Sequence, residues 1–171
     1  MTITASHNSE THPIVVPGWT AILNGAIFIR AFIVALVLGS ILTAINQPDA
    51  IFSGATLELL PFALVYITPF AVVTFSQFLG IRQALRDGAP LPAGERFIDT
   101  VKAHSIPSKA ALTGLVVGTL NTFITAAGAL LATASLAEIP LPLIAQAFVL
   151  PFLFGLLSQA ISYRRAAARL V

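Results

Sequence analysis

Uncharged hydrogen-bonding side chains recur inside the most apolar stretches of this sequence. Thr43, Asn46 and Gln47 are spaced so that they share one face of a helix. Gln77 and Gln159 each directly follow a serine in later apolar stretches. Amide and hydroxyl groups can hydrogen-bond a small anion without holding it too tightly to release it. The pattern therefore predicts weak anion recognition by neutral donors, and the alternative is helix packing through the same hydrogen bonds.

These two interpretations apply differently to hydroxyls, amides and cations. Helix packing is favoured for any single Ser or Thr, since these residues commonly bridge membrane helices. For amides, which are costlier to place in lipid, the two interpretations stand about level. The flanking cations either reach the headgroups and hold the topology or draw an anion to the inner vestibule. The candidate substrate-binding residues are Arg30, Thr43, Asn46, Gln47, Gln77, Lys109, Asn121, Thr122 and Gln159.

Chemistry that needs a charged or nucleophilic group within the membrane is absent from these apolar stretches. None of them contains Asp, Glu, Lys, Arg or His, which excludes haem ligation by histidine and a proton relay through an intramembrane carboxylate. The sequence has no phosphate-binding loop, and it has no cysteine to form disulfides or thiolate metal sites. We therefore expect no catalytic site, no metal and no cofactor, and the chain is not predicted to be an enzyme.

Four long apolar stretches must position the candidate residues. They cover residues 31–46, 59–81, 110–137 and 139–163, and each is close to the roughly 20 residues with which a helix crosses a bilayer. Of the 171 residues, 57% are hydrophobic and 9% are charged, whereas soluble domains carry about a quarter charged residues. The sequence predicts an all-α integral membrane protein with four transmembrane helices.

The cationic residues determine the predicted orientation. All nine lie before the first helix, between the second and third helices, or after the fourth helix, and the other loops have none. By the positive-inside rule, both termini and the central linker are expected in the cytoplasm of a bacterium, with the chain in its inner membrane. The nine residues are Arg30, Arg82, Arg86, Arg96, Lys102, Lys109, Arg164, Arg165 and Arg169.

An internal duplication relates the two halves of the chain. Residues 37–43 match 116–122 at an offset of 79, and residues 69–77 match 151–159 at an offset of 82. Because each half contains two helices, the repeats are expected to have the same orientation, as two tandem parallel helical hairpins. The predicted divisions are 1–29 (tail and interfacial segment), 30–82 (first repeat), 83–108 (cytoplasmic linker), 109–164 (second repeat) and 165–171 (C-terminal tail).

The two duplicated prolines, Pro69 and Pro151, are predicted to bend or gate their helices, because each deprives the carbonyl four residues earlier of its donor. Thr43 and Pro69 stand at equal distances along the chain from Arg30 and Arg82. We therefore expect the threonine and the proline of each repeat to form a belt at one depth, about 20 Å from the inner cations.

Two acidic residues, Glu58 and Glu138, stand where the second and fourth helices are predicted to begin. A carboxylate there favours a capping role, because the helix dipole is positive at that end. In the linker, the spacing of Phe97, Val101 and Ile106 predicts a short surface helix.

Four segments of the first repeat resemble the small nitrate/nitrite transporter NrtS family: Arg30-Ala31, 36–43, 45–49 and 66–70. The resemblance covers most of residues 30–82 and only short pieces of the second repeat. It implies a nitrate or nitrite carrier that assembles from several two-helix units. The sequence departs from the family pattern at Pro48 and where the second repeat would carry the Asn-Gln pair. Either the first repeat holds the recognition residues or the substrate differs.

We therefore expect a transporter of small inorganic anions, nitrate or nitrite before others, that forms a homo-oligomer, most simply a dimer, in the lipid bilayer. No nucleic-acid partner is expected. The competing hypothesis is a non-transporting structural or accessory membrane protein, in which the same amides only hold helices together.

Overall fold

The computed structural model describes residues 25–133 and 141–170, and the regular structure in these residues is entirely α-helical. Two short helices, α2 (Pro48–Phe52) and α4 (Phe97–Ala103), lie between longer ones. The long helices are α1 (Gly25–Asn46), α3 (Leu59–Asp87), α5 (Ile106–Thr133) and α6 (Leu141–Ala167).

The four long helices are long and apolar enough to cross a membrane. They also expose large hydrophobic side chains, among them Ile29, Val116 and Phe123, each more than half accessible. So much exposed apolar surface is unfavourable in water and is suited to contact with lipid. The chain is therefore a multi-pass membrane protein, and the prediction of an all-α protein with four long apolar helices is confirmed.

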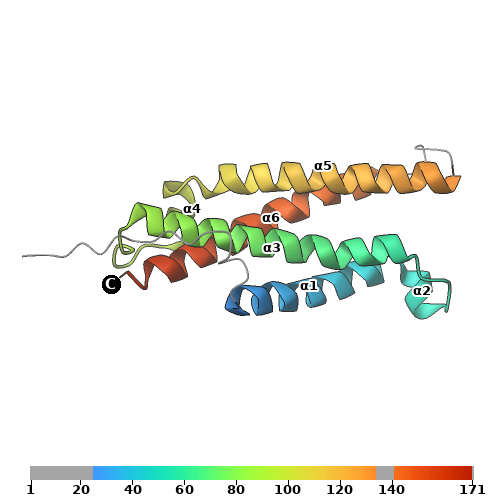
Figure 1. Ribbon diagram of the computed structural model, residues 1–171, viewed down its shortest axis with the longest axis horizontal. Coiled ribbons are helices and arrows are strands. Elements are labelled where there is room, and N and C mark those ends of the chain that lie inside the picture. The colour runs from blue at the N-terminus through green and yellow to red at the C-terminus, as the bar shows by residue number, and fades with distance from the viewer. Residues whose placement is uncertain (1–24, 134–140, 171) are drawn as a thin grey trace, which may run out of the picture.

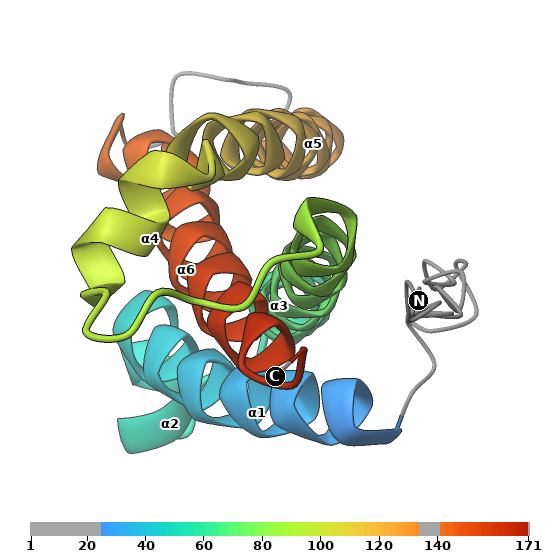
Figure 2. The same ribbon diagram turned by 90° about the vertical axis from the view of Figure 1, so that its left-hand side faces the viewer.

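Two helix pairs meet through α3 and α6 (Figure 1). Helix α1 packs against α3, α5 packs against α6, and α3 and α6 share the most extensive interface. In the end-on view, α1 and α5 lie on opposite sides of the α3–α6 pair (Figure 2). Within the described residues, α1 approaches neither α5 nor α6. The polar side chains at the α3–α6 interface, among them Ser76 and Gln159, are completely buried.

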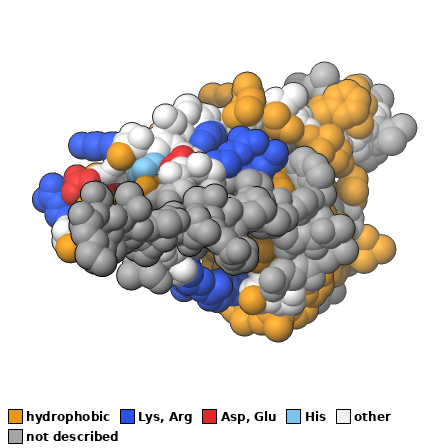
Figure 3. Space-filling model, turned by 60° about the vertical axis from the view of Figure 1, so that its left-hand side comes forward, with side chains coloured by type: hydrophobic (Ala, Val, Ile, Leu, Met, Phe, Trp, Pro, Cys, Tyr) orange, Lys and Arg blue, Asp and Glu red, His pale blue; other side chains and the backbone are white. Residues whose placement is uncertain are grey.

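One end of the bundle holds nearly all the positive charge, and we call it the basic end. It comprises residues 82–109 and the last turns of α6, with α4 across it (Figure 1). Eight of the nine cations lie there and the ninth, Arg30, lies near the start of α1, whereas the opposite end has no described cation. In Figure 3 the visible Lys and Arg side chains lie at the left and in the middle of the molecule, and the side chains coloured on its right are mostly hydrophobic.

Glycine permits the close approach of the helices within each pair. A Cβ atom on Gly39 would lie 2.3 Å from Tyr66 Cδ1, and one on Gly118 would lie 2.4 Å from Phe148 Cδ1. Carbon atoms attract best at about 3.5–4.0 Å, so any side chain at either glycine would push the aromatic ring away. The buried face of each outer helix repeats every four residues: Ile27, Ala31, Ala35, Gly39 and Thr43 in α1, and Ile106, Ala110, Gly114 and Gly118 in α5.

The helices at the basic end are longer than the hydropathy pattern predicts. Helix α3 continues to Asp87 and α5 begins at Ile106, so both helices extend into the predicted linker, residues 83–108. Helix α1 begins at Gly25, before the predicted start. The predicted short linker helix is present as α4. The polar residues Gln83 and Asp87, which follow the apolar stretch in α3, hydrogen-bond to side chains of α5 and α6. A hydropathy pattern contains no information on such contacts.

The predicted belt at one depth is wrong. Gly39 of α1 and Tyr66 of α3 lie at the same level, because they are in contact. The two helices run in opposite directions, so Thr43 lies one turn from this level toward the end that carries α2, and Pro69 lies nearly one turn from it toward the basic end. At 1.5 Å per residue, the two are roughly 10 Å apart along the bundle. The assumption of equal cation depth fails, because α3 continues past the level of Arg30 before it reaches its own arginines.

Candidate functional site

At the end that carries α2, the two neighbouring amides have different environments. Gln47 donates from Nε2 to the Glu58 carbonyl oxygen at 3.1 Å, and its Oε1 accepts the Glu58 backbone N–H at 2.9 Å. Asn46, the last residue of α1, is exposed. The predicted capping by the Glu58 carboxylate is wrong: Glu58 precedes α3 but its side chain makes no capping bond. Glu138 lies outside the described residues. Gln47 thus connects the end of α1 to the start of α3.

Midway along the bundle, two of three candidate polar residues hydrogen-bond within or between helices. Thr43 is buried and donates to the Gly39 carbonyl at 2.7 Å. Thr68 of α3 donates to Asn121 Oδ1 of α5 at 3.1 Å. The Thr122 hydroxyl is buried without a hydrogen-bond partner. Thr43 and Asn121 therefore fit the helix-packing interpretation in this conformation.

The α3–α6 interface carries a line of polar residues toward the basic end. Ser76, Gly80 and Gln83 follow one face of α3 and lie against Gly155 and Gln159 of α6. A Cβ on Gly80 would lie 2.3 Å from the Gln159 backbone oxygen, so the two helices are in backbone contact there. This close crossing seals the centre of the bundle.

Several polar groups in that sealed interface lack partners. Ser76 and Gln159 are completely buried, and Gln77 is nearly so. The Ser76 hydroxyl and Gln159 Oε1 have no hydrogen-bond partner, and further along α3 the buried Arg82 Nε has none either. An unsatisfied buried polar group costs about 1–3 kcal/mol. Natural structures keep few such groups, and each one requires an explanation.

Gln83 joins three helices and the linker at the basic end. Its Oε1 accepts a hydrogen bond from Lys109 Nζ of α5, and Gln159 Nε2 of α6 lies 3.5 Å from the same oxygen. Its Nε2 donates to the His104 backbone oxygen. Lys109 and Gln159, both predicted as site residues, are therefore brought together through a residue that the prediction assigned to the linker.

Next to Gln83, three side chains form a cluster between the ends of α3 and α6, in which Tyr163 is buried. Asp87 Oδ2 lies 2.9 Å from His104 Nδ1 and accepts the Tyr163 hydroxyl at 2.9 Å. The His104 and Tyr163 rings lie over each other with centroids 4.1 Å apart. This cluster fixes the segment that follows α4 against the ends of α3 and α6.

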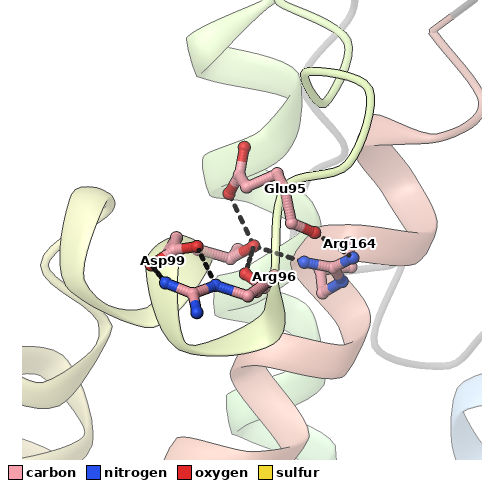
Figure 4. Close-up of polar contacts among 5 residues, drawn as sticks. Glu95, Arg96, Asp99 and Arg164 are labelled. Carbon is pink, nitrogen blue, oxygen red and sulfur yellow. Dashed lines mark hydrogen bonds and ion pairs between the residues drawn. The ribbon is translucent and has the colours of Figure 1, made fainter.

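Arg164 fastens α4 to the end of α6 (Figure 4). Its guanidinium donates to Thr100 Oγ1 at 2.7 Å and to the Glu95 backbone oxygen at 3.0 Å. The Thr100 hydroxyl donates in turn to the Glu95 carboxylate at 2.6 Å. Arg96 pairs with Asp99 one helical turn later on the exposed side. The linker therefore forms an ordered strap across the basic end.

The positive charge at the basic end is largely uncompensated. Among the described residues, the ion pairs are Arg96 with Asp99 and His104 with Asp87. Lys109 donates to a neutral amide rather than a carboxylate, and Arg30 is exposed. A cluster of unpaired cations raises the local concentration of anions by electrostatic attraction.

Two shallow apolar grooves lie on the lateral faces of the bundle. One, of about 300 Å3, lies between α1 and α3, and its lining includes Phe32, Ala35, Leu36, Tyr66, Ile67 and Phe70. The other, of about 290 Å3, lies between α5 and α6 and is lined by Ala111, Gly114, Leu115, Phe148, Val149 and Phe152. None of the predicted site residues lines either groove. The predicted prolines, Pro69 and Pro151, are buried within α3 and α6.

Sequence analysis missed Gln83, Asp87, His104 and Tyr163, which form most of the polar network at the basic end. A signal for part of it was present, since Ser76, Gln83 and Asp87 share helical spacing. The apolar stretch ends before the first arginine, Arg82, so hydropathy alone places Gln83 and Asp87 outside the helix.

Comparisons with family models, with curated proteins and with solved structures found no match.

Proposed function

We propose that this chain is a carrier for small inorganic anions, nitrate or nitrite before others, in the inner membrane of a bacterium. The observation that carries the proposal is the sealed α3–α6 interface, where completely buried polar groups without partners lie beside uncompensated cations. A protein that needed only helix packing would gain stability by replacing Ser76 or Gln159 with apolar residues. Groups kept at this cost are expected where a polar substrate must pass.

The proposed architecture is a tandem duplication of one helical hairpin. The sequence offset of 79 relates the buried faces of α1 and α5, including Ala31 with Ala110 and Gly39 with Gly118. The offsets of 79 and 82 also relate all six lining residues of the α5–α6 groove to residues that line the α1–α3 groove. Matching grooves support two hairpins of the same orientation, related by an axis between α3 and α6.

The proposed orientation places the basic end in the cytoplasm, because lysines and arginines near membrane spans are retained on that side. The chain has no cysteine, so single cysteines report topology without background. Lys102→Cys, at the exposed surface of α4, should be protected from an impermeant maleimide in intact cells. Phe52→Cys, 77% exposed at the other end, should be labelled. The reverse pattern would overturn the proposed orientation.

In the conformation described, the polar groups do not line an open cleft. Transport therefore requires that α3 and α6 separate at their crossing or that a second copy completes the route. We propose a homodimer as the simplest assembly. Cross-linking of the carrier in native membranes and its mass in detergent would measure the subunit number.

The decisive experiment is nitrate and nitrite uptake into proteoliposomes that contain the purified chain. Uptake above that of empty vesicles, reduced by Gln159→Leu with the fold intact, is the expected result. Leucine is matched to glutamine in size and removes only the polar group. Absence of uptake of either anion by the folded protein would reject the carrier proposal.

The alternative is a structural or accessory membrane protein. It is favoured by one set of observations: Gln47, Thr43 and the Thr68–Asn121 pair all hydrogen-bond within the chain. The two hypotheses differ at the α3–α6 interface. Under the accessory hypothesis, Gln159→Leu removes an unsatisfied group and stabilises the protein without loss of any transport.

A further inference from the structure

We propose that Lys109 and Gln159 form an inner binding station for a monovalent oxyanion, and that Gln83 Oε1 occupies the place of the anion oxygen in the conformation described. The proposal deepens the carrier function, on which it rests. Its residues come from three helices that enclose the bundle centre at the basic end.

The geometry around Gln83 Oε1 is that of an anion site. Two N–H donors converge on this single oxygen: the Lys109 ammonium from α5, and the Gln159 amide from α6. The second contact is long, at 3.5 Å, so the neutral oxygen satisfies Gln159 incompletely. An anion oxygen would bind both donors more strongly, because hydrogen bonds to a charged acceptor are about twice as strong as neutral ones.

No described carboxylate is paired with Lys109 or Gln159, and Asp87, one turn after Gln83 on α3, is paired with His104 and Tyr163 instead. Lys109 is half-buried and donates to no described carboxylate. The Ser76 hydroxyl, completely buried and without a partner, lies two turns from Gln83 on the same face of α3 and is a further donor toward the bundle centre. One ammonium with neutral donors balances one negative charge, so the station favours a monovalent over a divalent oxyanion.

Gln83 also connects this station to the strap. While its Oε1 accepts from Lys109, its Nε2 holds the His104 backbone oxygen in the segment between α4 and α5. An anion that displaces Gln83 from Lys109 therefore frees the side chain that ties this segment to α3. Anion binding is therefore coupled to release of the strap from α3. Gln83 acts as a positioning residue, because its Oε1 and the anion oxygen alternate as the acceptor for Lys109.

The test measures nitrate binding by the full chain in lipid nanodiscs, as the rise in melting temperature with nitrate concentration. The unsubstituted protein should show a saturable rise with nitrate and none with sulfate at equal ionic strength. Lys109→Met should abolish the rise. Lys102→Met, a matched loss of charge on the exposed surface of α4, should leave it intact.

Gln83→Glu is the most discriminating variant. Its carboxylate would be a permanent anion paired with Lys109, but it could no longer donate to the His104 backbone oxygen. The variant should therefore keep the helical circular dichroism of the unsubstituted chain and no longer respond to nitrate. Loss of the response in a folded protein cannot be caused by misfolding. Gln83→Ala removes the competing oxygen and should lower the apparent Kd for nitrate by about 3- to 10-fold.

The outcomes separate the two proposals. If the unsubstituted chain transports nitrate but Lys109→Met and Gln83→Glu transport and bind it normally, the station is overturned and the carrier function stands. If the folded, unsubstituted chain neither binds nor transports nitrate or nitrite, both proposals fail.

Discussion

The close crossing of α3 and α6 is expected to be the least tolerant place in the bundle for added volume. In Gly80→Ala, the new Cβ would lie 2.3 Å from the Gln159 backbone oxygen and 3.0 Å from the Tyr163 backbone nitrogen. These are backbone atoms of a helix, so they cannot turn aside as a side chain does. The helices must separate by roughly 1 Å to restore ordinary contact distances. Overpacking of this kind costs about 1–3 kcal/mol.

The same substitution elsewhere provides the control. In Gly128→Ala, the nearest atom to the new Cβ is Leu60 Cδ2 at 3.4 Å, which is an ordinary contact with a flexible side chain. Both glycines lie inside long helices, so the gain from helix propensity, about 1 kcal/mol, is common to both variants and cancels in their difference. Gly80→Ala should therefore unfold about 1–3 kcal/mol more easily than Gly128→Ala.

The free energy of unfolding can be measured in mixed micelles titrated with sodium dodecyl sulfate and followed by the loss of helical circular dichroism. Gly80→Ala should unfold at a lower denaturant fraction, and Gly128→Ala at the same or a higher fraction than the unsubstituted chain. Equal stability of the two variants would mean that α3 and α6 do not meet at Gly80. The sealed interface, on which the proposed station depends, would then be incorrect.

Two further substitutions test the remaining polar contacts in the same assay. Gln47→Ala removes both hydrogen bonds to the Glu58 backbone and should lower the free energy of unfolding by about 1–2 kcal/mol. Asn46→Ala, at an exposed position, should change it by no more than about 0.5 kcal/mol. A larger loss for Asn46→Ala than for Gln47→Ala would contradict the connection described between α1 and α3. For Thr68 and Asn121, a double-mutant cycle with Thr68→Val and Asn121→Leu should give a coupling energy near 0.6 kcal/mol, and additivity of the two changes would show that α3 and α5 are not joined there.

The fold was predictable in its broad form and the site only in part. The four long apolar helices and the gathering of cations at one end follow from runs of neighbouring residues. Of the predicted site residues, Lys109 and Gln159 meet in one network, whereas Thr43, Gln47 and Asn121 serve contacts within the bundle. An amide in an apolar run has the same sequence signature whether its partner is a substrate or a backbone group, so periodicity could not separate these roles.

Hydropathy and charge are properties of short stretches of chain, and the bilayer and the positive-inside rule act on those stretches directly. The four membrane-spanning helices were therefore readable from the linear order of residues. The meeting of Gln83 with Gln159, and of Asp87 with Tyr163, depends instead on the rotation and register of α3 against α6. Those are set at the backbone contact between Gly80 and Gln159, and the register within each outer helix pair is set by the fit of aromatic rings over Gly39 and Gly118. Such contacts join residues distant in the chain, and only the packed bundle decides which polar groups share a site.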